Sequence, residues 1–413
     1  MSTGQDSRSL MSADVQACPY GYYRQLREAA PLYRMPDTGF WLVTSFELAR
    51  EIIRQPDLFA SGVSPMALRP GGVPAAVIDV FANEGWLPKA SCSTSDPPAH
   101  TRVRSFLEPL FTMKRMREIA PLIERTVEEL VRDWPDRQEV EFVSAFAHPL
   151  PMIVIAELIG VPPDNLPRFK AWSDAIVEPF SMMVSEEREV ECARLVVEMQ
   201  HYFKAMLEER ARHPAADLLT TVAQSSAPDR QGFDLAEQLT ILTIDLLASG
   251  NETTTAAIAS GLKLLAEDPA THATLRADPE RLENFCEEVL RLESPAQGMF
   301  RRVTRDTVLG GQALREGELI SLRFGAANRD PGQFPDPDRI DLDRRPAGKH
   351  LAFGIGRHHC IGAQLARQEL LSSFRRLTGR YRRISMAPCR PTPEYQPSFF
   401  GRNLRELYLV LEA

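Results

Sequence analysis

One of the six cysteines stands in a segment whose residue types suit metal chemistry. The stretch from His350 to Arg367 reads HLAFGIGRHHCIGAQLAR, and three glycines surround its cysteine, Cys360: Gly354, Gly356 and Gly362. Glycines let a backbone approach a large flat ligand closely, and a helix that begins directly after a cysteine favours the thiolate. The segment therefore indicates a thiolate that could bind heme iron as an axial ligand.

The other cysteines show no paired spacing that would suggest disulfides or a zinc site. They are widely scattered: Cys18, Cys92, Cys192, Cys286 and Cys389. This usage fits a reducing cytosol. The polar start lacks the apolar core of a signal peptide, and the most apolar stretch, residues 150–159, is shorter than the ~20 residues of a spanning helix. We expect a cytoplasmic protein without a membrane segment.

The pattern around Cys360 is more specific than the cysteine alone. The order Phe353-Gly354-x-Gly356-x-His358-x-Cys360-x-Gly362 closely resembles the heme-binding loop of the cytochrome P-450 family. The resemblance implies one large, mainly α, heme-enclosing domain with a minor β part over residues 1–413. It also implies heme b as cofactor, Cys360 as axial iron ligand, a heme-ligand loop at 350–362, and Phe353, Gly354 and His358 beside the heme.

A second motif of that family lies about 70 residues before the cysteine. Glu288 and Arg291 match its ExxR pattern. At positions i and i+3 of a helix the two side chains share a face, so they can pair and reach a third partner. The implied role is structural. The third partner is Arg344 or Arg345, and the sequence leaves both open.

The longest expected helix, residues 235–266, contains the run ASGNETTT at 248–255. This run resembles the family's oxygen-activation motif, in which a glycine precedes an acid and an alcohol. A mid-helix glycine costs ~1 kcal/mol, so Gly250 needs a reason, which the family supplies as a widened turn beside the heme. The resemblance implies that Glu252 relays protons from solvent and that Thr253 hydrogen-bonds the oxygen species being reduced.

Heme propionates need cationic donors in a partly dry site. The segment DPPAHTRVR at 96–104 resembles the start of the family's propionate-binding helix, and His100 and Arg104 share one face at i and i+4. Arg301 matches a third contact, with Arg302 as the competing register, and His358 matches a fourth. Arg102 is expected to face solvent.

The substrate pocket is expected to draw on the Gly-, Pro- and Ser-rich segment 61–95, interpreted as a lid or pocket wall, and on residues near 170–185. Its remaining wall residues, by motif position, are Asp245, Ala248, Ser249, Ala296, Met299 and Phe399. Asp245 departs from an aliphatic pattern. It could meet a polar or cationic substrate group, or it could be a hydrogen-bonded or solvent-facing helix residue.

Composition and periodicity agree with this interpretation. The 413 residues are 44% hydrophobic and 25% charged, with a net charge of −8, which disfavours nucleic acid as a partner. Helical spacing dominates residues 45–295, and β character is expected near 32–44, 300–325 and 380–411. No flexible linker separates the halves.

The implied activity is that of a heme-thiolate monooxygenase that uses dioxygen and two electrons to oxidise a small organic substrate. Ferredoxin and ferredoxin reductase are the expected donors, and the chain is expected to be a monomer. An acidic ferredoxin would need a local basic patch, for which the candidates on the cysteine side are Arg102, Lys114, Arg115, Arg357 and His359. The alternatives are a peroxide-driven peroxygenase and a non-catalytic heme-binding sensor.

Overall fold

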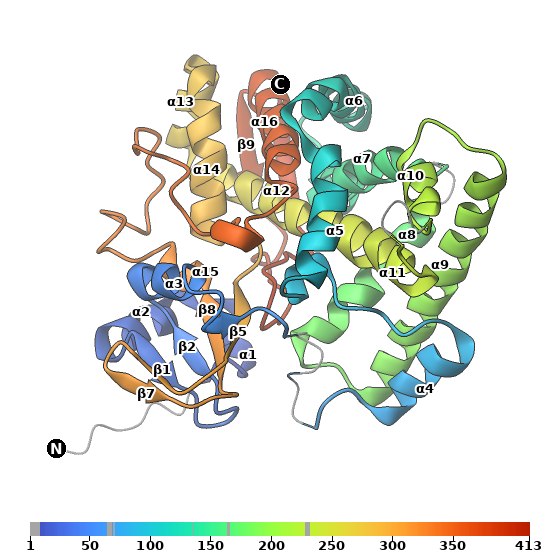
Figure 1. Ribbon diagram of the computed structural model, residues 1–413. Coiled ribbons are helices and arrows are strands. Elements are labelled where there is room, and N and C mark those ends of the chain that lie inside the picture. Colours follow the sequence, from blue (N-terminus) through green and yellow to red (C-terminus); the bar gives the residue numbers. More distant parts are fainter. Residues whose placement is uncertain (1–8, 64–67, 69–70, 135, 163–165, 228–231) are drawn as a thin grey trace.

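The computed structural model describes residues 9–63, 68, 71–134, 136–162, 166–227 and 232–413. Helices dominate, and a small sheet lies at one side of the molecule (Figure 1). The helices are α1 Ala13–Ala17, α2 Tyr20–Ala29, α3 Phe46–Ile53, α4 Ala75–Glu84, α5 Ala99–Leu107, α6 Met113–Val131, α7 Pro149–Ile159, α8 Leu166–Val177, α9 Glu186–Arg212, α10 Leu218–Gln224, α11 Leu235–Thr240, α12 Ser249–Glu267, α13 Pro269–Ala277, α14 Leu282–Glu293, α15 Phe324–Ala327 and α16 Ala363–Arg380.

Three sheets accompany the helices. The largest has the order β1-β2-β8-β5-β3, and the others are β4-β10-β9 and the hairpin β6-β7. Their bounds are β1 Leu32–Arg34, β2 Trp41–Val43, β3 Phe59–Ala60, β4 Glu139–Glu141, β5 Gly298–Val303, β6 Thr307–Leu309, β7 Gln312–Leu314, β8 Leu319–Arg323, β9 Arg383–Met386 and β10 Tyr408–Glu412. The short strands β3 and β4 fall inside the region expected to be helical.

A continuous rod of α11, a π-helical segment (Ile241–Ala248) and α12 crosses the centre of the molecule (Figure 1). Asp234 starts the rod because its carboxylate accepts from the amide of Glu237, while the Glu237 carboxylate accepts from the amide of Asp234. In the π segment the amide of Ser249 bonds to the carbonyl of Ile244, five residues earlier. The predicted long helix is confirmed, and its turn is widened just before Gly250.

The helix α12 is surrounded by apolar packing on most sides. Its side chains Ala257, Ile258 and Leu262 are buried in one cluster with residues of α6, α7, α14 and α16. A second cluster packs α7, α8 and α9 against the π segment. The rod therefore lies between two cores, which fixes the position of any side chain that it presents to a site.

The expectation of a loop over the whole of 61–95 is wrong for residues 75–84. They form α4, because Val77, Val80 and Phe81 are buried in the cluster that contains α9. Residues 64–67 and 69–70 of the expected lid lie outside the described residues. The end of the segment is tied down, since Gln200 on α9 bonds both the amide and the carbonyl of Trp86.

Across the described residues, we find no helix that combines the length and the apolar character needed to span a bilayer.

Candidate heme and oxygen-activation site

The cysteine loop has the backbone that its glycines suggested. Gly354 and Gly356 adopt φ angles of +63° and +69°, a region that residues with a Cβ rarely occupy. The amide of Cys360 donates to the carbonyl of Phe353 at 2.8 Å, and α16 follows at Ala363. The Cys360 side chain is exposed at this point. The loop thus presents a sulfur on a rigid turn.

The surroundings act on the Cys360 thiol in two directions. The nearby protein mass removes water and raises the pKa of the thiol, whereas the amide of Gly362 and the charges of Arg104 and Arg367 lower it. Bonding to a cation such as iron is the further influence that would stabilise the thiolate.

A cluster of buried nitrogen donors lies near this loop. The His100 side chain is 3% exposed and neither ring nitrogen has a hydrogen-bond partner, while Nε2 of His358 is also buried without one. The two rings lie 4.3 Å apart between centroids. Burial lowers the pKa of His358 to about 4, helped by the positive charge of Arg301. Unpartnered buried donors are costly, so the cluster suits an anionic group such as a propionate.

Arg301 completes the cluster from strand β5. It is 5% exposed, whereas Arg302 is exposed to solvent. Of the two candidate arginines, Arg301 is therefore the one that points inward. Burial lowers the pKa of Arg301 to about 10. Arg104 lies closer to the cysteine loop, where its Nη1 donates to the carbonyl of His359 at 2.7 Å and its Nε donates to Glu108.

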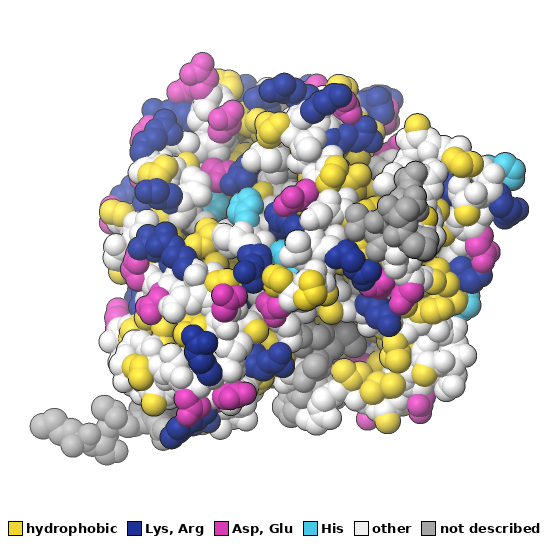
Figure 2. All heavy atoms as spheres, in the orientation of Figure 1, with side chains coloured by type: hydrophobic (Ala, Val, Ile, Leu, Met, Phe, Trp, Pro, Cys, Tyr) yellow, Lys and Arg dark blue, Asp and Glu magenta, His cyan; other side chains and the backbone are white. Residues whose placement is uncertain are grey.

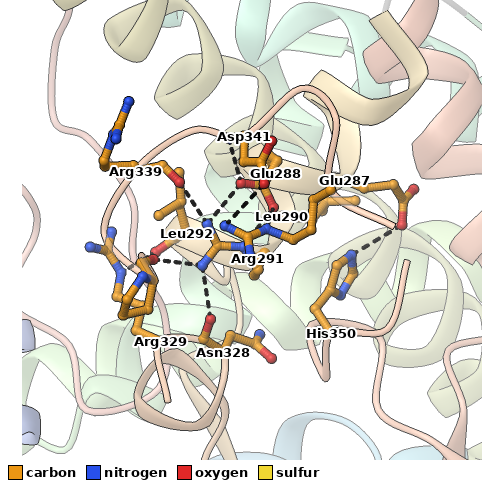
Figure 3. A network of polar contacts seen from close by, with 12 residues as sticks. Glu287, Glu288, Leu290, Arg291, Leu292, Asn328, Arg329, Arg339, Asp341 and His350 are labelled. Carbon is orange, nitrogen blue, oxygen red and sulfur yellow. Dashed lines mark hydrogen bonds and ion pairs between the residues drawn. The ribbon is translucent and has the colours of Figure 1, made fainter. Parts of the chain in front are cut away.

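Glu288 and Arg291 of the ExxR motif form a fully buried network with the chain at Asn328, Arg339 and Asp341 (Figure 3). Glu288 and Arg291 are both 0% exposed and are joined by two bonds of 2.6 and 2.8 Å. Arg344 donates its Nε to Glu288 at 3.0 Å, whereas Arg345 bonds to the side chain of Asn284. The structure therefore selects Arg344 as the third partner.

The remaining donors of Arg291 go to the carbonyls of the chain that leads to the cysteine loop. They reach Asn328, Pro337 and Arg339 at 2.6 to 3.0 Å (Figure 3). The amide of Asp341 donates to Glu288 at 2.9 Å. The pair thus fixes an irregular segment to α14, which is the structural role that the resemblance implied.

The acid of the oxygen-activation motif is held by neighbours that the sequence analysis did not identify. Glu252 accepts hydrogen bonds from Ser173 at 3.2 Å and from the side chain of Asn251 at 3.1 Å. His148 and Asp174 each place a ligand-type atom within 4.8 Å of it. Burial, with the negative charge of Asp174 next, raises the pKa of Glu252 to about 7. A carboxyl with that pKa can both hold and release a proton near neutral pH.

Three further residues of this motif lie next to Glu252 on the helix: Ser249, Gly250 and Thr253. The hydroxyl of Thr253 donates to the carbonyl of Ser249 at 3.2 Å, and that of Ser249 donates to Ile244 at 2.8 Å. A Cβ added at Gly250 would lie 3.3 Å from Ile155, so this glycine lets α12 approach α7 closely. Close packing of α12 against α7 is therefore one structural reason for a glycine at position 250.

The expected pocket residues differ in exposure. Ser249 is exposed, Asp245, Ala296 and Met299 are half-buried, and Ala248 is buried. Phe399 is only 1% exposed, because its ring stacks on Phe300 at 5.6 Å and lies against Arg323. Phe399 packs in the cluster that contains Phe300, and its assignment to the substrate pocket stays a prediction.

Several of the basic residues that were expected to form a docking patch are paired with acidic side chains. Arg102 does not point into solvent alone, because it pairs with Glu237 and lies over the ring of Phe233. Arg115 pairs with Glu118, and Arg357 lies 3.9 Å from Asp57. Figure 2 shows Lys and Arg side chains interspersed with Asp and Glu on the face that carries α5.

Comparison with known proteins agrees with this geometry. The family described as cytochrome P-450 matches residues 79–397. The 6-deoxyerythronolide B hydroxylase of Saccharopolyspora erythraea is 34% identical over 405 residues, covering 95% of this chain and 96% of that one. The crystal structure of P450BioI, in complex with an acyl carrier protein that carries hexadec-9Z-enoic acid, superposes with a TM-score of 0.86 at 29% identity, covering 97% of this chain and 99% of that one.

A third comparison is with CYP109E1 from Bacillus megaterium, solved in complex with testosterone. It is 30% identical, has a TM-score of 0.84, and covers 97% of this chain and all of that one. The fold and the site define a heme-thiolate oxygenase, and the chain belongs to the cytochrome P-450 family. It is a monooxygenase that binds heme b through an axial cysteine thiolate and acts on a small molecule with dioxygen.

Proposed function

We propose that Cys360 supplies the axial thiolate and that the chain oxidises a small organic substrate with electrons from a ferredoxin and its reductase. The observation that carries the assignment is the exposed Cys360 side chain on its glycine-built loop, near buried ring nitrogens of His100 and His358 that have no partners and beside the buried Arg301. Heme, when bound, supplies the activation of dioxygen at its iron.

The donor cluster fits the acid groups of that cofactor. His100 and His358 would each give a hydrogen bond to a propionate, which satisfies nitrogens that are otherwise buried and unpaired. Arg301 brings the positive charge, and burial makes its interaction with an anion stronger than it would be in water. Arg104 adds a further guanidinium next to the cysteine loop.

The proton route runs through the acid–alcohol pair. Asp174 is partly exposed and its carboxylate lies within 4.8 Å of that of Glu252, so it connects solvent with the buried acid. Ser173 and Asn251 orient the Glu252 carboxyl by donating to its Oε1. Thr253, the next residue, presents the hydroxyl that passes the proton on and holds oxygen in place.

A ferredoxin would dock on the side of the cysteine loop. Arg357 lies in the loop itself and Lys114 is an exposed residue at the start of α6, and an acidic partner would benefit from such local charge in spite of the net charge of −8. The affinity should therefore fall as the salt concentration rises.

The decisive experiment is the ferrous carbonyl spectrum of Cys360→Ser. Wild type should give the red-shifted Soret band of a thiolate heme, and the variant should lose it, while Cys389→Ser, which alters another exposed cysteine, should keep it. Retention of the band in Cys360→Ser would refute the ligand assignment.

Turnover assays distinguish a ferredoxin-dependent monooxygenase from a peroxygenase and from a non-catalytic heme-binding sensor. Product formed with ferredoxin, reductase and NAD(P)H supports the proposal, product formed only with peroxide indicates a peroxygenase, and no product with either indicates a sensor. Thr253→Ala should still bind heme and substrate but divert electrons to hydrogen peroxide. Unchanged coupling of electrons to product would show that protons bypass Thr253.

A further inference from the structure

Asp245 is a half-buried residue, and one oxygen of its carboxylate is shielded from water and has no partner. It lies in the π-helical segment, where its Oδ1 accepts a hydrogen bond of 2.9 Å from the amide of Cys92. Its Oδ2 is buried and has no hydrogen-bond partner. Within the described part of the chain, no lysine, arginine or histidine forms an ion pair with this carboxylate.

A buried carboxylate oxygen without a hydrogen-bond partner destabilises the fold unless another group or a ligand pairs with it. Burial raises the pKa of Asp245 to about 7, against the opposing effect of the Cys92 amide. An apolar residue would cost less here, because the neighbouring helix positions Ile241, Leu242, Leu246 and Leu247 are all buried and apolar. A carboxylate in this position therefore points to a ligand group that pairs with it.

The position of Asp245 connects it with the reacting site. Along the rod it precedes the exposed Ser249 by four residues and Glu252 by seven. Its partner Cys92 lies in the short turn before α5, the helix that carries His100 and Arg104. Asp245 thus lies where the wall of the expected pocket meets the helix that begins the cofactor site.

The segment around Cys92 is already fixed at that place. The amide of Lys89 donates to the hydroxyl of Thr240 at 2.9 Å, and Gln200 holds Trp86 from α9. These three contacts therefore fix the segment, two of them to the rod and one to α9, and only the contact at Cys92 uses a charged group. Loop closure alone would be served by a neutral acceptor such as an asparagine, so the charge of Asp245 is left without a role in closure.

From these observations we infer that Asp245 selects substrates that carry a cationic nitrogen, by pairing its Oδ2 with that nitrogen. The inference rests on the proposed monooxygenase function and names the substrate class of the same site. A protonated amine both donates to the free oxygen and offsets the charge that burial penalises, and a quaternary ammonium supplies the charge alone. A neutral hydroxyl supplies only the hydrogen bond, and an anion supplies neither.

The test uses the heme-loaded full chain and one alkyl chain with three head groups: octyltrimethylammonium, 1-octanol and octanoate. The quaternary nitrogen has no lone pair and so does not bind iron itself. Binding is followed by the shift of the Soret band from low to high spin, and independently by the rise in melting temperature on adding ligand. We expect wild type to bind the ammonium about tenfold more tightly than the alcohol, and octanoate most weakly.

Asp245→Asn keeps an oxygen that can accept from the Cys92 amide and removes the charge. It should lose the preference for the ammonium while its affinity for 1-octanol stays within about twofold of wild type. The matched control is Asp79→Asn, which removes an exposed carboxylate from α4 and should behave as wild type.

Equal affinity of wild type for the three head groups, or an unchanged ammonium preference in Asp245→Asn, would overturn the inference. The wild-type comparison needs no variant, so the test holds even where Asp245→Asn fails to fold. Failure of the proposed function is recognised separately, because wild type would then lack the thiolate band in the ferrous carbonyl spectrum.

Discussion

Glu288 and Asp245 both have carboxylate oxygens shielded from water, but the surroundings of the two carboxylates are opposite. The carboxylate of Glu288 receives donors from Arg291, Arg344 and the amide of Asp341. That of Asp245 receives one amide and has one buried oxygen without a partner. A complete set of partners marks a group that holds the chain together, whereas an incomplete set marks a group that awaits a ligand.

The same distinction applies to the buried bases. Arg291 places its donors on Glu288 and on three backbone carbonyls, while both ring nitrogens of His100 are unused. The molecule thus contains a closed network at the ExxR pair and an open donor cluster near the cysteine loop. If complete hydrogen bonding distinguishes structural groups from ligand-binding groups, substitutions in the two kinds of network should have different effects.

The largest effect is expected from breaking the closed network. Arg291→Ala leaves Glu288 charged and short of a main partner in a fully buried position, so the free energy of unfolding should fall by about 3–5 kcal/mol. Urea denaturation of purified protein measures it. The control Arg345→Ala removes only an exposed bond to Asn284 and should cost less than about 0.5 kcal/mol. Equal losses in the two variants would contradict the structural role.

A smaller and pH-dependent effect is expected from the open carboxylate. The pKa of Asp245 is raised to about 7, so between about pH 4 and pH 7 the unfolded chain is ionised while the folded chain keeps its proton. Wild type should therefore lose stability as the pH rises through this window, by at most about 1.4 kcal/mol per pH unit from this group. Asp245→Asn should remove that part of the slope. The difference between the two urea-denaturation series isolates Asp245, and parallel curves would show that its carboxyl is not perturbed.

The smallest effect is expected from the open donor cluster, measured as cofactor retention. His100→Phe keeps the buried ring volume but removes the nitrogens, so heme should dissociate about tenfold faster, in line with the loss of one hydrogen bond to a charged group. Transfer of heme to an excess of apomyoglobin measures the rate. His272→Phe is the control, because His272 is equally buried, 3% exposed, on α13. An unchanged rate in His100→Phe would remove His100 from the cofactor site.

The sequence predicted what depends on local pattern. The long helix, the cysteine loop and the spacing of Glu288 and Arg291 all follow from periodicity and motif. The choice between Arg344 and Arg345 did not, because adjacent residues of an irregular segment have no periodicity to order them. The structure resolves it through one bond, from Arg344 to Glu288.

Contacts between elements that lie far apart in the sequence were the main features that the sequence did not predict. Ser173 and His148 are unremarkable in the sequence, and they meet Glu252 only because α7 and α8 pack on the central rod. The bond from Cys92 to Asp245 spans 153 residues. The helix α4 could have been found, since its buried residues Val77, Val80 and Phe81 recur at helical spacing within a segment dominated by glycine and proline.

The π-helical segment also has an evolutionary consequence. In an α-helix each residue turns the chain by about 100°, and a π segment accommodates residues beyond the α-helical repeat. Deleting one residue from Ile241–Ala248 would thus restore α-helical hydrogen bonding there and leave the side chains on either side close to their present orientation. A change of one residue in the length of this segment can therefore be absorbed within the π turn, without turning Glu252 and Thr253 away from the neighbours described above.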